Sequence, residues 1–170
     1  MASETGAAEL KPGQIIPAFS LAAANRPERI GPWNYKQRRN LVIFFLHSAE
    51  CQKCGGLLQE MAANYGEYQR LETEALAIAP DEIDRLSRLA RELDLPFPVL
   101  VDDEGKVRDR YLKSAGRSEA AVVVADRWGA IFECQVSGRE HDLPAEAGIR
   151  EWLEFIEFQC EECFPSEWPL

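Results

Sequence analysis

The stretch LVIFFLHSAECQKC, residues 41–54, joins an uninterrupted apolar run to two cysteines that stand three positions apart. Residues 41–46 show no alternation of polar and apolar side chains, which is typical of a strand buried on both faces of a sheet. After Cys54 the apolar residues recur at steps of three and four, which predicts a helix. The cysteine pair therefore stands where a buried strand meets a helix. In open α/β sheets that end of a central strand usually carries the chemistry.

The rest of the chain continues the alternation of strands and helices. An extended segment at residues 14–21 and a loop at residues 25–40 precede the first strand. We expect strands at residues 41–46, 75–79, 97–101, 120–125 and 130–136, and helices at residues 54–71, 81–93, 107–112 and 142–161. This order predicts an α/β fold with parallel central strands, helices on both faces and an antiparallel hairpin at one edge of a mixed sheet. We expect one domain at residues 14–163, a flexible N-terminus at 1–13 and a C-terminal tail at 164–170.

Two local features of the helices make further predictions. Asp81, or the residue before it, is expected to cap the helix at residues 81–93, with Ile83 on the inner face of that helix. Gly55 and Gly56 are poor helix formers, each up to about 1 kcal/mol less favourable than alanine. We therefore expect another group to approach the backbone closely just after the cysteine pair.

The composition excludes several classes of protein. The 170 residues carry 29 acidic and 19 basic side chains, a net charge of -10, which argues against a nucleic-acid surface. The longest strongly apolar stretch, residues 41–46, is far shorter than the roughly 20 residues that cross a bilayer. The first ten residues carry acids and no apolar run, so they do not resemble a secretory signal. Five cysteines, an odd number, do not suit a disulfide scaffold. We expect a cytoplasmic protein without nucleic-acid or membrane partners.

The pair Cys51 and Cys54 is the strongest functional signal in the sequence. Cys51 would lie at the amino end of a helix, where unpaired N–H groups and the helix dipole stabilise a thiolate. Lys53 adds positive charge beside it, although Glu50 opposes this. Cys54 is one turn later, close enough to form a disulfide with Cys51 and so to resolve an intermediate. Zinc ligation and inert packing thiols are the alternatives to this redox interpretation.

Two neighbours of the pair are candidates for supporting roles. Ser48 could donate a hydrogen bond to the Cys51 thiolate or to its substrate, although serine is also a common turn residue. His47 could move protons near neutral pH, but a lone histidine beside a strand end is more often a polar boundary residue.

Four segments resemble the peroxiredoxins, the alkyl hydroperoxide reductase/thiol-specific antioxidant group of the thioredoxin superfamily. They are residues 17–19 (PAF), 42–45 (VIFF), 51–54 (CQKC) and 95–105 (LPFPVLVDDEG). The resemblance runs from about residue 11 to residue 158, and the last segment is its more specific part. It implies a thioredoxin fold in which Cys51 is the attacking, or peroxidatic, cysteine.

The sequence departs from this family at positions that matter for activity. Peroxiredoxins usually carry Pro-x-x-x-Thr/Ser-x-x-Cys around the peroxidatic thiol; Ser48 and Cys51 fit, but Phe44 holds the proline position. The arginine that the family brings to the thiolate aligns with Ala120, and Arg117 is the nearby candidate. Thioredoxins place a cis-proline facing the cysteine pair, yet no proline occurs between residues 99 and 143. These losses leave the expected fold intact and weaken the expectation of efficient turnover.

The remaining cysteines are less informative. Cys160 and Cys163 share a helix face near the end of the last predicted helix. They could be surface thiols, a second redox pair, an intersubunit disulfide, or zinc ligands together with Cys51 and Cys54. Topology argues against the zinc site, because the last helix runs away from the first pair. Cys134 alternates with Phe132 and Val136, which predicts one shared strand face and a small core residue.

Together these observations predict a thiol-dependent oxidoreductase of the thioredoxin/peroxiredoxin type. Its catalytic residues would be Cys51 as nucleophile and Cys54 as resolver, with Ser48 as hydrogen-bond donor and Lys53 tuning the charge. No organic cofactor or metal is expected. The expected partners are a dithiol protein reductant, a disulfide-bearing protein substrate or a hydroperoxide, and a homodimer is a reasonable expectation. The alternative is a redox-sensing or partner-binding module that has the fold without efficient turnover.

Overall fold

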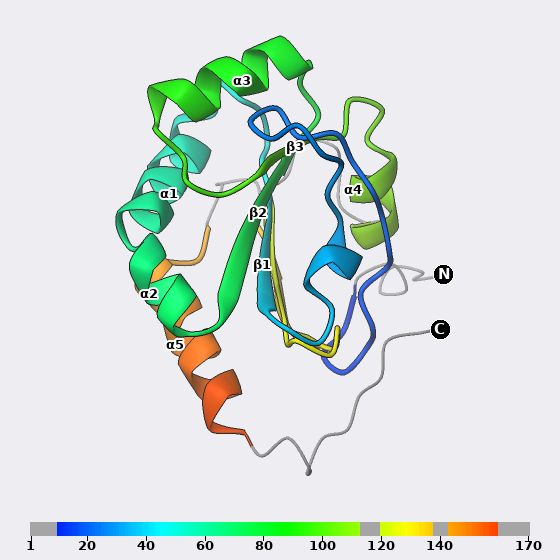
Figure 1. The fold of residues 1–170 in the computed structure, drawn as a ribbon, viewed down its shortest axis with the longest axis vertical. Coiled ribbons are helices and arrows are strands. Elements are labelled where there is room, and N and C mark those ends of the chain that lie inside the picture. Colours follow the sequence, from blue (N-terminus) through cyan, green and yellow to red (C-terminus); the bar gives the residue numbers. More distant parts are fainter. Residues whose placement is uncertain (1–9, 113–119, 138–142, 160–170) are drawn as a thin grey trace, which may run out of the picture.

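The apolar run forms β1 (Asn40–Phe45), and all six of its residues are buried. β1 lies in the middle of a five-stranded sheet of order β3-β2-β1-β4-β5. It pairs in parallel with β2, which pairs in parallel with β3, while β4 and β5 form an antiparallel hairpin on the other side. Figure 1 shows this sheet nearly edge-on between its helices. The predicted mixed α/β arrangement is therefore confirmed.

The computed structural model describes residues 10–112, 120–137 and 143–159. Its elements after β1 are α1 (Gln52–Ala63), α2 (Tyr65–Arg70), β2 (Thr73–Ala79), α3 (Ile83–Glu92), β3 (Val99–Val101), α4 (Lys106–Tyr111), β4 (Ala121–Ala125), β5 (Ile131–Val136) and α5 (Glu146–Phe158). A short 3-10 helix, η2 (Pro32–Tyr35), precedes β1 within the region expected to be a loop. Within the described ranges, no helix has the length and apolar character needed to cross a membrane.

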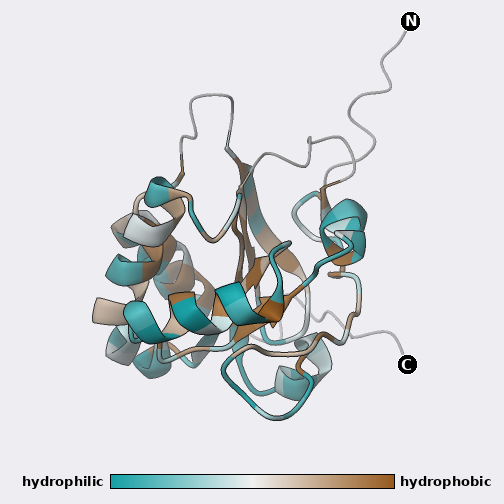
Figure 2. Cartoon of the chain, turned by 90° about the horizontal axis from the view of Figure 1, so that it is seen from above, coloured by the Kyte–Doolittle hydropathy of each residue, from teal (hydrophilic) through white to brown (hydrophobic). Residues whose placement is uncertain are grey.

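The sheet separates two hydrophobic clusters because successive side chains of each strand point to opposite faces. On β1, Val42 and Phe44 point into one cluster and Leu41 and Ile43 into the other. Full burial of each such side chain contributes about 1.5–3 kcal/mol, so β1 stabilises both layers at once. In Figure 2 the strands of the sheet are mainly brown, whereas the helices around them mix teal, white and brown residues, which is the pattern expected for a buried central sheet covered by amphipathic helices.

Different elements cover the two faces. Apolar side chains of α1, α2, α3 and α5 belong to the first cluster, which we call the helical core. The second cluster contains residues of α4 and of the N-terminal segment, including Ile16, Phe19 and Tyr111. The Tyr111 hydroxyl donates to the Pro17 carbonyl at 2.6 Å and fastens that segment to the sheet. The cysteine pair lies on the helical-core side.

The helix predicted at residues 54–71 is two helices, because Asn64 ends the first one. The Asn64 side-chain amide donates to the Glu60 carbonyl at 2.8 Å and to Glu146 Oε1 at 3.1 Å. Asparagine side chains compete in this way with the backbone hydrogen bonds of a helix. The backbone of Asn64, at φ -107° and ψ 16°, leaves the helical path before α2 begins.

Three other local predictions were wrong. The N-cap of α3 is Glu82, and Asp81 lies outside the helix with a different role. Ile83 is 46% exposed, so it does not face the core. A β-bulge between Val124 and Ala125 changes the pairing of β5, and Phe132 packs on the helical core while Cys134 faces the second cluster. The expected shared face of these two residues is therefore absent.

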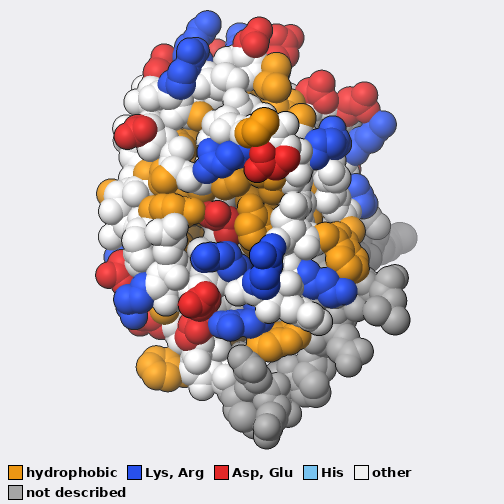
Figure 3. Space-filling view, viewed as in Figure 1, with side chains coloured by type: hydrophobic (Ala, Val, Ile, Leu, Met, Phe, Trp, Pro, Cys, Tyr) orange, Lys and Arg blue, Asp and Glu red, His pale blue; other side chains and the backbone are white. Residues whose placement is uncertain are grey.

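The last helix begins later than predicted, with Ala145 as its N-cap. Its buried stripe includes Ile149, Leu153 and Ile156, as expected, whereas Trp152 is only partly buried. Asp142, the expected start, lies outside the described residues. On the face drawn in Figure 3, basic and acidic side chains are interspersed with apolar ones, so the net negative charge does not form one continuous acidic surface there.

Candidate active site

Cys51 is the N-cap of α1, where the loop that follows β1 turns into the helix. Its backbone is extended, at φ -69° and ψ 117°, and its carbonyl accepts the Gly55 N–H at 2.9 Å. Its sulfur accepts the Cys54 N–H at 3.4 Å, which occupies one of the free donors of the first helical turn. The side chain is partly exposed. An anion on this sulfur would therefore meet a backbone donor and the positive end of the helix, and solvent can reach it.

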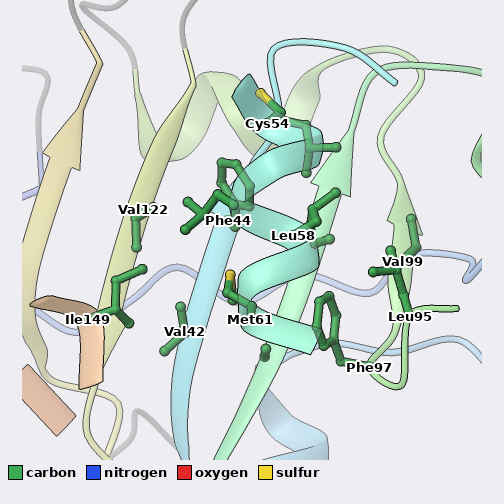
Figure 4. Packing of buried hydrophobic residues seen from close by; sticks show 14 of the residues in the cluster. Val42, Phe44, Cys54, Leu58, Met61, Leu95, Phe97, Val99, Val122 and Ile149 are labelled. Atoms are coloured by element: carbon green, nitrogen blue, oxygen red, sulfur yellow. The ribbon is translucent and has the colours of Figure 1, made fainter. Parts of the chain in front are cut away.

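Cys54 lies in a very different environment although it is only three residues away. It is 1% exposed and belongs to the helical core, above Leu58 and Met61 on the same helix in Figure 4. Burial raises the pKa of the Cys54 thiol to about 12, and backbone hydrogen bonds from His47 and Ser48 offset this only in part. The His47 N–H donates to Cys54 Sγ at 3.3 Å. The pair thus consists of one accessible sulfur and one protected, protonated thiol.

The other two predicted site residues lie beside the pair. The Ser48 hydroxyl accepts the Glu50 N–H at 3.3 Å, and the Ser48 carbonyl accepts the Cys51 N–H at 3.3 Å. Ser48 thus shapes the loop that leads into the helix. Lys53 is exposed in the first turn of α1. Their proposed effects on the thiolate stay predictions.

The sequence interpretation missed the contribution of β2 and α3 to this site. Asp81 follows β2, and its Oδ1 accepts the Ala49 N–H at 3.0 Å. Arg85, one helical turn further, lies 3.7 Å from Asp81 Oδ2 and 3.3 Å from Glu50 Oε1. A signal was available in principle, since Asp81 follows a strand parallel to β1 and the carboxyl ends of parallel strands meet at one edge.

Two surface hollows flank the loop before Cys51. One, of about 420 Å³, is lined by Ser48, Pro80, Asp81, Glu82 and Arg85. The other, of about 290 Å³, is lined by Ala49, Glu50, Arg85, Arg88, Leu89 and Glu92. Both hollows are open to solvent and are lined by residues of the loop 48–50 that precedes Cys51, although Cys51 itself lines neither of them.

The two departures from the peroxiredoxin pattern lie in the interior. Phe44, at the proline position, is fully buried in the helical core next to α1 (Figure 4). Ala120, aligned with the family arginine, is 1% exposed and donates its N–H to the Ser137 hydroxyl at 3.0 Å. Arg117 lies outside the described residues. The apolar Ala120 side chain supplies no positive charge at this position.

Of the five cysteines, Cys51, Cys54 and Cys134 fall in the described part of the chain, and none of these three is in a disulfide. Cys134 is partly buried against the second cluster, in agreement with a packing role. Within the same residues no three His, Cys, Asp or Glu side chains gather as metal ligands would. Cys160 and Cys163 lie outside the described residues, so the alternatives for that pair stay open.

Comparison with known proteins identifies relatives along most of the chain. A profile of the AhpC/TSA family matches residues 12–131. A Mycobacterium tuberculosis protein named as a peroxiredoxin is 26% identical over 135 residues, which are 79% of this chain and 74% of that protein. Peroxiredoxin Bcp of Escherichia coli K12 is 28% identical over 106 residues, 60% of this chain and 64% of Bcp. The crystal structure of peroxidoxin BcpB from Mycobacterium tuberculosis matches with a TM-score of 0.74 at 15% identity, over 87% of this chain and 97% of that one. The expected thioredoxin fold is confirmed.

Proposed function

Since the chain belongs to the AhpC/TSA family, we propose that it reduces hydroperoxides with Cys51 as the attacking thiol and Cys54 as the resolving thiol. Membership makes the protein a thiol peroxidase or a closely related thiol oxidoreductase. The choice of substrate and the roles of the two cysteines are the proposal. They rest on the contrast between the two sulfur environments.

The reaction has three balanced steps. The Cys51 thiolate attacks one peroxide oxygen, the O–O bond breaks, and the other oxygen takes a proton and leaves as an alcohol or water. This oxidises Cys51 to a sulfenic acid. The Cys54 thiol then attacks the Cys51 sulfur, an S–S bond forms, and the hydroxyl group leaves as water after taking the Cys54 proton. Finally a dithiol donor reduces the disulfide by exchange and is itself oxidised.

The observation that carries the assignment is the asymmetry of the pair. Cys51 is partly exposed at the helix N-cap, and its sulfur accepts the Cys54 N–H at 3.4 Å. Cys54 is 1% exposed, and burial raises its pKa to about 12. Solvent can reach the Cys51 sulfur, which meets a backbone donor at the helix N-terminus, whereas burial protects the Cys54 thiol and disfavours its thiolate. Cys54 is one helical turn away, which suits it to a second, intramolecular step.

Ser48 and Lys53 complete the proposed site. The Ser48 hydroxyl oxygen accepts the Glu50 N–H, which leaves its own proton available. We assign to this hydroxyl the role of donating a hydrogen bond to the Cys51 thiolate or to the bound peroxide. Lys53 supplies positive charge in the first turn. Because Lys53 is exposed and solvent screens exposed charges, its contribution is a modest bias toward the thiolate.

The proposal extends to partners and location. The two open hollows beside the loop of residues 48–50 leave room next to the cysteine pair for a dithiol protein that recycles the disulfide. The odd number of cysteines supports a reducing cytoplasm as the working compartment. A homodimer is part of the proposal by analogy with the family.

Disulfide exchange with a protein substrate is the second candidate function. The buried, apolar Ala120 favours it, because the position aligned with the peroxide-activating arginine carries no positive charge. Peroxide attack depends on such electrostatic stabilisation of the O–O cleavage, whereas thiol–disulfide exchange does not need it at that position. If both reactions are slow, the protein would act as a redox-sensing module without efficient turnover.

Two assays on four proteins test both candidates. Peroxide consumption and reduction of insulin disulfides are measured for the wild type, Cys51→Ser, Cys54→Ser and Cys134→Ser. We expect Cys51→Ser to lose peroxide reduction and Cys134→Ser to match the wild type. Cys54→Ser should consume one equivalent of peroxide and stop at the sulfenic acid when no thiol reductant is present. Wild-type peroxide consumption no faster than that of dithiothreitol alone would refute the first function. Insulin reduction without peroxide reduction would establish the second. Metal analysis of protein purified without chelator tests the zinc alternative, which is excluded if no zinc is bound.

A further inference from the structure

We infer that Asp81 is a positioning residue for the redox centre: its carboxylate holds the loop of residues 47–50 and so fixes where the Cys51 sulfur stands. The inference rests on the proposed role of Cys51 as the reacting thiol. Asp81 lies in the loop between β2 and α3, away in sequence from the loop that carries the cysteine pair.

The contact crosses from one strand end to the next. β1 and β2 are parallel neighbours, with Phe45 opposite Ile78, so the segments that follow them emerge side by side. Asp81 follows the end of β2, and Ala49 follows the end of β1. The Ala49 N–H donates to Asp81 Oδ1 at 3.0 Å, which is a well-formed hydrogen bond to a carboxylate oxygen.

Burial makes this contact effective. The Asp81 side chain is only 8% exposed, so solvent competes little for its oxygens. Arg85 lies 3.7 Å from the other oxygen and balances the charge, but its side chain is 58% exposed. Exposed ion pairs contribute little to stability. The hydrogen bond to Ala49, rather than the ion pair, therefore fixes the loop.

The remaining loop contacts transmit this position to Cys51. The Ser48 carbonyl accepts the Cys51 N–H at 3.3 Å, and the Ser48 hydroxyl accepts the Glu50 N–H at 3.3 Å. Residues 48–51 are thus one hydrogen-bonded unit. Moving Ala49 would move the N-cap and with it the sulfur that begins the reaction.

The loop of residues 47–50 has a second contact, between the His47 backbone and Cys54, and Asp81 differs from it chemically. The His47 N–H donates to Cys54 Sγ at 3.3 Å, and that sulfur changes its covalent partner when the disulfide forms. The Asp81 oxygens take no part in any step. The Asp81 contact with Ala49 therefore does not depend chemically on the redox state of the pair.

The test compares Asp81→Ala, which removes the acceptor, with Asp81→Asn, which keeps an oxygen acceptor and removes the charge. Asp84→Ala is the matched control, because Asp84 is an exposed carboxylate on the same side of the sheet, in the first turn of α3. Three quantities are measured: the alkylation rate of Cys51 by iodoacetamide, the rate of its oxidation by a stoichiometric amount of peroxide, and the melting temperature.

We expect Asp81→Ala to slow both Cys51 reactions by about tenfold or more, since displacements of about 1 Å at a reacting centre can cost up to about 100-fold. Asp81→Asn should stay within about threefold of the wild type, and Asp84→Ala should be unchanged. Recycling by the dithiol donor should be affected less than Cys51 oxidation. A folded Asp81→Ala protein with wild-type Cys51 rates would overturn the inference, as would an Asp81→Asn protein as slow as Asp81→Ala.

Two further measurements keep the result interpretable. If Asp81→Ala does not fold, Asp81→Ser takes its place, since its shorter side chain cannot reach Ala49 in the same geometry. Amide hydrogen exchange of residues 47–50 reports the loop directly: protection of Ala49 in the wild type and its loss in the variant are expected, and an unprotected wild-type amide would contradict the contact. Alkylation needs no peroxidase activity. A wild type that alkylates at Cys51 but consumes no peroxide would therefore refute the proposed function without touching the role of Asp81.

Discussion

Unfolding the protein should accelerate alkylation of Cys54 far more than alkylation of a half-exposed cysteine. In the folded protein burial raises the pKa of Cys54 from its usual 9.0 to about 12. At pH 8 roughly one thiol in ten thousand is then ionised, against about one in ten for an unperturbed thiol. Ionisation alone thus makes the folded thiol about 1,000-fold poorer in thiolate.

A second effect acts in the opposite direction. A thiolate of higher pKa is intrinsically more nucleophilic, with a Brønsted coefficient of about 0.4–0.5. A pKa higher by about 3 therefore makes the Cys54 thiolate roughly 15- to 30-fold more reactive. The net expectation is that folding slows Cys54 alkylation about 30- to 60-fold at pH 8. The 1% exposure of the side chain slows it further, so these figures are a lower bound on the protection.

The assay is iodoacetamide labelling followed by peptide mass spectrometry, with and without urea. Cys134, which is partly exposed, serves as the internal control in the same samples. Between pH 8 and pH 10 the labelling rate of Cys54 should rise about 100-fold in the folded protein and only about tenfold in the unfolded one. Folded-state labelling of Cys54 within about fivefold of the unfolded rate at pH 8 would refute the protected resolving thiol.

Three further outcomes follow from the packing and the pKa shifts. Leu58→Ala, at a fully buried position, should lower the free energy of unfolding in urea by about 2–5 kcal/mol, while exposed Gln59→Ala should change it by less than about 0.5 kcal/mol. Gly56→Ala should raise it by up to about 1 kcal/mol, because an added Cβ meets no atom within 4 Å; a loss would show hidden crowding. Burial raises the pKa of Tyr35 and of Cys54 to about 12, from usual values of 10.0 and 9.0. Above about pH 9 the unfolded chain loses these protons first, so stability should be full below that pH and fall as pH rises toward 12; constant stability there would contradict both shifts.

The sheet could be predicted from the sequence because its signals are local. An unbroken apolar run such as residues 41–46 can be satisfied only by burial on two faces, and the structure places alternate residues in two clusters. Phe132 shows where the same reasoning fails. A bulge in the β4–β5 hairpin adds one residue to β5, so the Phe132 side chain points to the opposite face of the sheet. No local sequence pattern indicates this bulge.

In the candidate site, too, local features could be predicted from the sequence and contacts between distant segments could not. The placement of Cys51 at a strand-to-helix junction followed from spacing, whereas the role of Asp81 depends on which strand lies beside β1. Aspartate is favoured at helix N-caps and also occurs in tertiary contacts. The sequence therefore predicted Asp81 as a helix cap, which is the more common of the two roles. The two glycines were also misjudged: an added Cβ at Gly55 or Gly56 would meet nothing within 4 Å, so no close approach within the described chain explains them.

The periodicity of α1 explains how two cysteines three residues apart come to have opposite environments. Cys54 is the first member of a buried stripe that continues with Leu57, Leu58 and Met61. Cys51 would be the next member toward the N-terminus, but as N-cap it has an extended backbone that takes its sulfur off the helical path. The helix end therefore separates a partly exposed position beside free backbone donors from a desolvated one within a single turn.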